Sequence, residues 1–321
     1  MAPSLVDLTL EQSVPRLPSH TTQPPPARGP SVALPSLQTL RILCDTNDCV
    51  RFMDHLSINP AATMEITGNL GTDSGIKRLL EIVSAHASRS TALLASRISL
   101  PHPHTRSAIS IRGYRDVDVR RLDLDELGDI DVTFDNLQPG DRPFAAALRG
   151  AGAIFSGVQY LSLVSENGSN VSWPSLFECV PSVETLEILG HPGPGFAEAL
   201  FHLRDVQNGE SSATSGPLLR LRELKLDDVY FRRWDGASWS HGGEFFDKLL
   251  DWTILRCNHG IPLERLQVWQ CRYATVKDIH RLREIVVEVD WDMWEQESDE
   301  DEDEDDDDDF YAHHHPMYGW Y

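Results

Sequence analysis

The chain has 321 residues, of which 40% are hydrophobic, and a formal net charge of −22 at pH 7. That length and composition allow one large or two ordinary domains with a sizeable core. Fifteen of the fifty acidic residues lie between Asp290 and Asp309, so the rest of the chain, with 35 acids and 28 bases, is only mildly acidic. This distribution argues against nucleic acid or an anionic membrane surface as the main ligand.

The cysteines and the hydropathy of the chain indicate an intracellular protein. No C-x-x-C pair or regular framework is present, as expected for reduced thiols rather than disulfides. There is no signal-peptide pattern, and no apolar run approaches the ~20 residues of a spanning helix. We therefore expect a cytoplasmic or nuclear location, or both. The five cysteines are Cys44, Cys49, Cys179, Cys257 and Cys271.

A six-residue pattern, apolar-x-x-apolar-x-apolar, recurs seven times from the first residues onward. Its last two apolar positions alternate with polar ones, which is typical of a short strand with one buried edge. Such a strand buries that edge by stacking beside the next copy, so the pattern predicts an irregular leucine-rich-repeat solenoid of the α/β class, with parallel strands on the concave face and helices on the convex face. The copies are Leu5/Leu8/Leu10, Leu37/Leu40/Ile42, Val158/Leu161/Leu163, Val183/Leu186/Ile188, Leu221/Leu224/Leu226, Leu263/Leu266/Val268 and Leu282/Ile285/Val287.

Helical periodicity fills several intervals between the copies. Residues Gly75–Ser88 and Gly243–Cys257 each place an apolar stripe on one side and predict convex-side helices. Shorter helices are expected at Phe144–Ala153, Pro174–Val180 and Phe196–Val206. Between Ile42 and Val158, weaker strand patterns are expected to supply missing turns at Thr63–Thr67, Ala108–Arg112 and Asp131–Phe134.

We expect a solenoid domain over residues 1–294 and a disordered tail over residues 295–321. Inside the domain, Pro15–Pro30 has six prolines and should form an extended insertion loop. In the tail, Glu295–Asp309 has thirteen acids in fifteen positions and cannot collapse against its own repulsion. An aromatic and histidine-rich end follows it.

Two motifs suggest chemistry, and each has a simpler interpretation. Asp129-x-Asp131 matches the short signature of aspartate-nucleophile phosphatases, but that signature needs an apolar strand before the first Asp. A solvated acidic turn explains it more simply. Cys257, His259 and Cys271 give at most three zinc ligands without paired spacing. We therefore predict no catalytic residue, no metal and no cofactor.

The polar positions between the apolar strand residues would lie side by side on the concave face. An exposed aromatic flanked by Arg and Gln, as at Trp269, has the composition of a binding hot spot. The alternative is that Trp269 packs beneath a loop or the C-terminal segment. The predicted partner-binding residues are Arg41, Tyr160, Glu187, Lys225, Arg265, Gln267 and Trp269.

Four segments resemble the repeat region of the F-box proteins with irregular leucine-rich repeats found in mushroom-forming fungi: LPSLQTLRIL (34–43), VPSVETLEIL (180–189), LLRLRELKLD (218–227) and IVVEVDW (285–291). In that family an N-terminal F-box recruits the adaptor of a cullin ubiquitin ligase, and the repeats are expected to hold substrates. The chain begins at Leu5 already inside a repeat, so we expect no F-box within it.

The resemblance implies a non-enzymatic protein-interaction scaffold, the substrate-recognition region of an F-box-type ligase component, with a protein partner on its concave face. Two alternatives stay open. The acidic tail could bind basic proteins such as histones, or Asp129 and Asp131 could serve a hydrolase.

Overall fold

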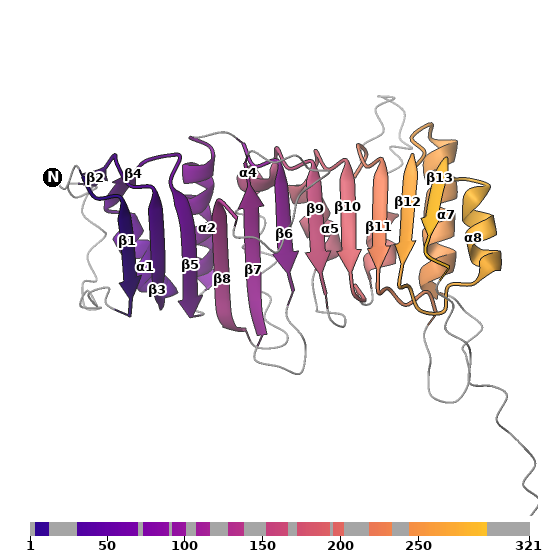
Figure 1. Ribbon diagram of the computed structural model, residues 1–321, viewed down its shortest axis with the longest axis horizontal. Coiled ribbons are helices and arrows are strands. Elements are labelled where there is room, and N and C mark those ends of the chain that lie inside the picture. Colours follow the sequence, from indigo (N-terminus) through magenta and orange to yellow (C-terminus); the bar gives the residue numbers. More distant parts are fainter. Residues whose placement is uncertain are drawn as a thin grey trace, which may run out of the picture.

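An 11-stranded sheet runs along the whole elongated body, in the strand order β1-β3-β5-β8-β7-β6-β9-β10-β11-β12-β13 (Figure 1). The computed structural model describes residues 4–12, 31–69, 73–89, 92–100, 107–115, 128–137, 152–165, 172–192, 195–201, 218–232 and 244–293. The strands of the sheet are β1 (Asp7–Glu11), β3 (Thr39–Asp45), β5 (Thr63–Asn69), β6 (Ala95–Ser99), β7 (Ser107–Tyr114), β8 (Ile130–Leu137), β9 (Tyr160–Val164), β10 (Thr185–Leu189), β11 (Glu223–Asp227), β12 (Arg265–Trp269) and β13 (Glu288–Trp291). Two short strands, β2 (Val32–Leu34) and β4 (Leu56–Ile58), form a separate parallel pair.

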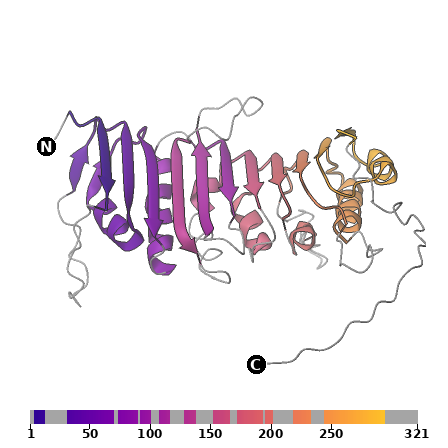
Figure 2. The same ribbon diagram turned by 60° about the horizontal axis from the view of Figure 1, so that its bottom comes forward.

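Helices cover one face of the large sheet and leave the other without a helix among the described residues (Figures 1 and 2). We call this second face, which points toward the viewer in Figure 1, the open face. The helices are α1 (Thr46–Met53), α2 (Asp73–Ala87), α4 (Gly152–Phe155), α5 (Trp173–Cys179), α6 (Phe196–Leu200), α7 (Glu244–Asn258) and α8 (Val276–Arg283). The prediction of an α/β fold built on a large, mostly parallel sheet is confirmed.

The repeated pattern sets the register of the parallel strands. Leu186 lies opposite Leu224, and Leu224 opposite Leu266, so equivalent apolar residues form a continuous buried row. All three are fully buried on the helix-covered side. The residues between them point to the open face, because successive side chains in a strand alternate between its two faces. The first six copies of the pattern therefore contain strands of this sheet.

The middle of the sheet departs from a simple succession of repeats. Strand β7 runs antiparallel to both of its neighbours, β6 and β8. The chain passes from β5 through α2 to β6, and then returns strand by strand through β7 to β8, which pairs with β5. The predicted strands at Thr63–Thr67, Ala108–Arg112 and Asp131–Phe134 are therefore present, but the last two lie in this reversed block instead of forming successive parallel turns.

Local signals place the helices. The Asp45 carboxylate accepts a hydrogen bond from Asn47 N at 2.8 Å and caps α1. Helix α5 carries Pro174 in its first turn, where no backbone donor is needed. The predicted helices at 75–88, 174–180 and 243–257 agree with α2, α5 and α7 to within a few residues.

The apolar sides of the helices and of the sheet make one continuous core. It is rich in large aromatic side chains toward α5, α6 and α7, where Trp173, Phe177 and Phe196 contact one another. Arg256 of α7 is also buried, and it donates to the carbonyl oxygens of Leu218 and Leu221 at 3.0 and 2.5 Å. Helix α7 is thereby attached to the turn that begins β11.

The seventh copy of the pattern, Leu282/Ile285/Val287, was wrong. Leu282 belongs to α8, and Val287 is 78% exposed. The strand starts at Glu288 instead and places Val289 and Trp291 opposite Leu266 and Val268. Five elements were not predicted from the sequence, namely α1, β2, β4, β6 and α8. The Pro-rich insertion and the acidic tail lie outside the described residues, and so does most of the helix predicted at 144–153.

Candidate functional site

A row of polar side chains crosses the open face from one end of the sheet to the other. We call it the central row, and each member lies in register with the next. It contains four of the seven predicted partner-binding residues. The central row is Thr9, Arg41, Glu65, Asp131, Arg112, Arg97, Ser162, Glu187, Lys225, Gln267 and Asp290.

Ion pairs neutralise the N-terminal part of the central row. Arg41 Nε lies 2.9 Å from Glu65 Oε2, and Arg112 Nε lies 3.1 Å from Asp131 Oδ2. Glu65 and Asp131 are adjacent in register, so the two pairs stand side by side with their carboxylates together. Arg41 and Glu65 are about half exposed, so their pair contributes less than about 1 kcal/mol to stability. The Arg112–Asp131 pair is mostly buried.

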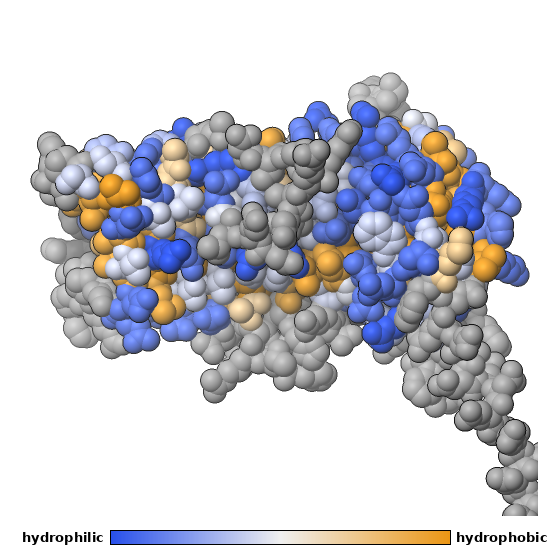
Figure 3. Space-filling model, in the orientation of Figure 1, coloured by the Kyte–Doolittle hydropathy of each residue, from blue (hydrophilic) through white to orange (hydrophobic). Residues whose placement is uncertain are grey.

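The C-terminal part of the open face has a different charge balance. We call the open-face side chains of β10 to β13, together with Asp292 directly after β13, the acidic end. Six of its members are acidic and two are basic. Hydrophilic side chains are gathered over this part of the face in Figure 3. The acidic end consists of Thr185, Glu187, Leu189, Glu223, Lys225, Asp227, Arg265, Gln267, Trp269, Glu288, Asp290 and Asp292.

Arg265 is the counter-ion for several carboxylates of the acidic end. Its guanidinium contacts Asp290 most closely, with Nε 2.9 Å from Oδ2. Glu223 and Glu288 lie 3.9 and 3.8 Å from it. The contacts raise the pKa of Arg265, mainly through the hydrogen bonds with Asp290. The guanidinium of Arg265 is therefore already used in ion pairs within the acidic end.

All seven predicted partner-binding residues lie on the open face, but not all of them are accessible. Tyr160 is only 5% exposed and Gln267 only 6%. Burial raises the pKa of Tyr160, and the nearby Glu187 carboxylate, which also hydrogen-bonds with Tyr160, raises it further. The Lys225 ammonium lies 5.2 Å from the centre of the Tyr160 ring. The sequence was therefore right about the face of these two residues, and wrong about their exposure.

Trp269 is the one aromatic member of the acidic end, and 44% of its surface is accessible. It ends β12 and lies opposite Asp227 in the register of β11 and β12. Its backbone carbonyl accepts a hydrogen bond from Asp228 N at 3.1 Å, which fixes the strand end that carries the indole.

The hydrolase alternative finds little support in the geometry around Asp129. Strand β8 begins at Ile130, so Asp129 precedes this strand, whereas the phosphatase signature places the first Asp after an apolar strand. Asp129 Oδ2 accepts from Arg115 N at 2.7 Å, and Asp131 is 8% exposed and paired with Arg112. Both carboxylates therefore already have structural partners.

The thiols and histidines show no metal site within the described residues, where no group of three or more His, Cys, Asp and Glu is arranged to hold an ion. Cys271 is completely buried, and burial raises the pKa of its thiol to about 12. Cys257 is exposed on α7.

Sequence reasoning missed three residues that shape the open face: Arg97, Arg112 and Asp227. Arg97 and Arg112 become neighbours only because β6 and β7 pair antiparallel. Asp227 ends β11, one position beyond the repeated apolar pattern. Its place after Leu226 was the available signal, because alternation assigns it to the same face as Lys225.

No family model matches the chain, and no curated protein and no solved structure matches it. Among the described residues, no helix combines the length and the apolar character needed to cross a lipid bilayer.

Proposed function

We propose that the chain is a non-enzymatic protein-interaction scaffold that holds its partner on the open face. One observation carries the proposal: a continuous row of polar and charged side chains crosses a sheet face that no described helix covers. A broad sheet face with polar groups at fixed spacing suits a large, flat ligand such as another protein.

We further propose that the strand–helix array is an irregular leucine-rich-repeat solenoid. The in-register rows of apolar residues from β9 to β12 support this, since stacked repeats bury equivalent residues against one another. The open face would then be the concave side of the array, where repeat proteins commonly bind their ligands.

The resemblance of the repeat segments to fungal F-box proteins suggests which partners the open face would bind. The open face would recognise substrates of a cullin ubiquitin ligase, in the cytoplasm or the nucleus. Its charge pattern favours selectivity, because fixed charges reject partners whose own charges fail to match them.

The test is proximity labelling in cells, with a biotin ligase fused to the full chain. Glu187→Lys reverses a charge in the central row, and partners of the open face should lose labelling by several-fold. Glu178→Lys is the matched control, because Glu178 is exposed on α5, on the helix-covered side. Thermal melting must first show that both variants are folded.

Ubiquitin-ligase function adds a second readout. Removal of the chain should lengthen the lifetime of partners that depend on Glu187, and restoring the Glu178→Lys variant should shorten it again. Equal labelling by both variants would count against the open face as the docking surface. Unchanged lifetimes would count against substrate recognition for a ligase.

A further inference from the structure

The acidic end has carboxylates without an internal counter-ion. Arg265 is occupied by Asp290. Lys225 makes no ion pair with a described carboxylate, and its ammonium lies over the Tyr160 ring instead. The negative charge left on this part of the open face is therefore available to a cation from outside.

Asp227 is the carboxylate at the centre of this unbalanced charge. Partial burial raises its pKa, and the carboxylates of Glu187, Asp228 and Asp292 raise it further. Among the described residues, no Arg or Lys pairs with Asp227. Asp228 already pairs with Arg272, whose Nε lies 3.0 Å from Oδ1. A positive group placed beside Asp227 would therefore be attracted mainly by the carboxylates of Asp227, Glu187 and Asp292.

An aromatic platform borders the same carboxylate. Trp269 lies opposite Asp227 on the neighbouring strand, and nearly half of its surface is accessible. The face of an indole ring attracts cations and is the best of the aromatic side chains in this role. Asp227 and Trp269 together thus offer a carboxylate and a stacking surface side by side.

A buried acceptor without a partner lies beside them. Gln267 is 94% buried, between Trp269 and Arg265 along β12, and its Oε1 accepts no hydrogen bond within the described structure. A buried acceptor without a donor is destabilising. A donor from a ligand that reaches this oxygen would therefore satisfy it.

We propose that the acidic end binds an arginine side chain from an extended basic segment of a partner protein. The guanidinium stacks on Trp269, pairs with the Asp227 carboxylate and donates one hydrogen bond to Gln267 Oε1. The inference rests on the proposed function of the open face as a protein-docking surface, and it adds the chemistry of the partner.

Arginine fits this set of groups better than lysine. The guanidinium is planar, so it can lie flat on an indole, and its five donors point outward in the plane toward a carboxylate and an amide oxygen at once. A lysine ammonium is a compact, strongly hydrated charge and gains less from stacking.

The test measures peptide binding to the full chain by fluorescence anisotropy. The probe is a fluorescein-labelled twelve-residue peptide of glycine and serine with three arginines. A matched peptide carries citrulline, which keeps the shape and loses the charge. Because the run Glu295–Asp309 also attracts cations, a photo-crosslinking version of each peptide, analysed by mass spectrometry, locates the bound site.

We expect the arginine peptide to crosslink to β11 and β12, and the citrulline peptide to lose this product. Asp227→Asn and Trp269→Ala should each weaken binding of the arginine peptide at least fivefold. Glu178→Gln is the matched control: it removes one exposed carboxylate from α5 on the helix-covered side, and it should change affinity less than twofold. Gln267→Leu should reduce affinity without removing the preference for arginine.

Crosslinks confined to residues 295–309, or wild-type affinity in both Asp227→Asn and Trp269→Ala, would overturn the arginine site. The proposed function can fail separately. A partner that is lost with Glu187→Lys but binds Asp227→Asn and Trp269→Ala normally would leave the docking surface standing and remove the arginine site. If no partner responds to Glu187→Lys, the docking surface itself is wrong.

Discussion

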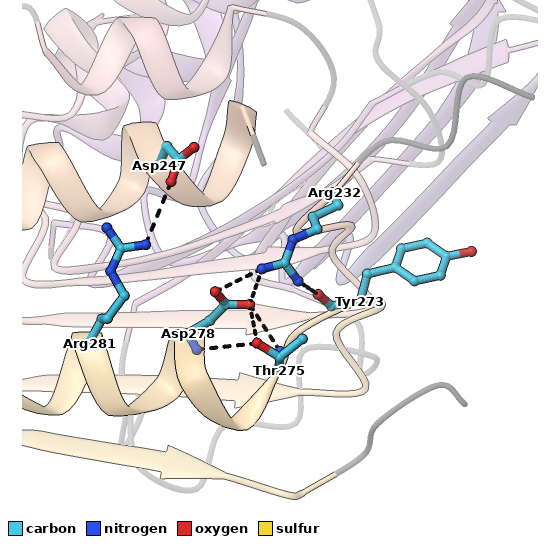
Figure 4. Close-up of polar contacts among 6 residues, drawn as sticks. All are labelled: Arg232, Asp247, Tyr273, Thr275, Asp278 and Arg281. Atoms are coloured by element: carbon cyan, nitrogen blue, oxygen red, sulfur yellow. Dashed lines mark hydrogen bonds and ion pairs between the residues drawn. The ribbon is translucent and has the colours of Figure 1, made fainter. Parts of the chain in front are cut away.

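Arg232 donates hydrogen bonds from Nη2 to both carboxylate oxygens of Asp278, at 2.8 and 2.6 Å, and from Nη1 to the carbonyl oxygen of Tyr273 at 2.6 Å (Figure 4). Asp278 also accepts from Thr275 N and Oγ1 at 3.1 and 2.8 Å, which completes a capping box at the start of α8. A single buried carboxylate thus joins the segment after β11 to the first turn of α8.

Arg232→Met should destabilise the protein by about 3 kcal/mol, because it leaves the buried Asp278 carboxylate without its cation. The Arg281–Asp247 contact supplies the control. It spans 3.9 Å between groups that are about half exposed, so Arg281→Met should cost no more than about 1 kcal/mol. Urea unfolding of the two variants measures the difference, and equal midpoints would contradict the buried-pair interpretation.

The stacked core predicts opposite behaviour for two adjacent residues of β11. Leu224 is fully buried, so Leu224→Ala should cost about 3 kcal/mol through lost contacts and the cavity left behind. Lys225 points to the open face, so Lys225→Ala should cost less than about 1 kcal/mol. Thermal melts of both variants provide the comparison. A Lys225→Ala variant as unstable as Leu224→Ala would show that the two faces have been assigned incorrectly.

Backbone strain after β12 allows a stabilising substitution. Gln270 follows the strand directly and has a φ of 49°, in the left-handed region that disfavours side chains. Gly190 and Asp228, which follow β10 and β11, also have positive φ, so the same backbone conformation follows three successive strands of the sheet. Gln270→Gly should raise the free energy of unfolding by up to about 1 kcal/mol, after the entropy of the unfolded glycine is subtracted.

Gln270→Val should lower the free energy of unfolding by about 1 to 2 kcal/mol, since a β-branched residue tolerates positive φ poorly. Denaturant melts of the two Gln270 variants form a matched pair. If Gly and Val shift stability in the same direction, the strain does not lie in this dihedral angle.

His86 should make stability depend on pH in the mildly acidic range. Burial lowers its pKa, and Nε2 of the ring lies 3.3 Å from the carbonyl oxygen of Ala62. The unfolded chain therefore binds a proton more readily than the folded chain between the two pKa values. Stability is complete above the unfolded value of about 6.5 and is lost as pH falls toward the folded value.

His86→Gln keeps a hydrogen-bond donor for Ala62 and removes the titration. Unfolding midpoints of the wild type and the variant should converge on acidification from pH 8 to pH 5, because only the wild type loses the His86 contribution. Parallel pH profiles would assign the acid sensitivity to other groups.

The sequence predicts this fold best where the apolar pattern coincides with a strand of the sheet. Leu186, Leu224 and Leu266 were placed correctly because, in each of their copies, a strand covers the last two apolar positions of the motif. At the seventh copy, Leu282 and Ile285 are three residues apart, a spacing that also suits a helix, and the helix–strand boundary in fact falls within the motif. The same motif can therefore lie within a strand or across the boundary between a helix and a strand. The alternation of apolar and polar residues distinguishes the two only when the neighbouring strands are known.

The sequence predicted which side chains lie on the open face, but it did not predict how deeply each one is buried. Alternation correctly assigned Arg265, Gln267 and Trp269 to one face, but it carried no information about depth, and Gln267 is buried between its two longer neighbours. Strand β6 escaped notice because ASRIS contains one large apolar residue, Ile98, and buries small ones beside it. The adjacency of Arg97 and Arg112 depends on the reversed strand order, which no local pattern encodes.

The reversed block of β6, β7 and β8 also determines how the molecule can assemble. In a plain array of repeats, each strand pairs with that of the next repeat, so folding can start anywhere and spread to the nearest neighbour. Here the partner of β5 is β8, which follows β6 and β7 in the sequence, and β9 pairs on the opposite side of the same block. The two ends of the sheet are therefore joined through a single three-strand junction, and we expect this junction to couple the folding of one end to that of the other.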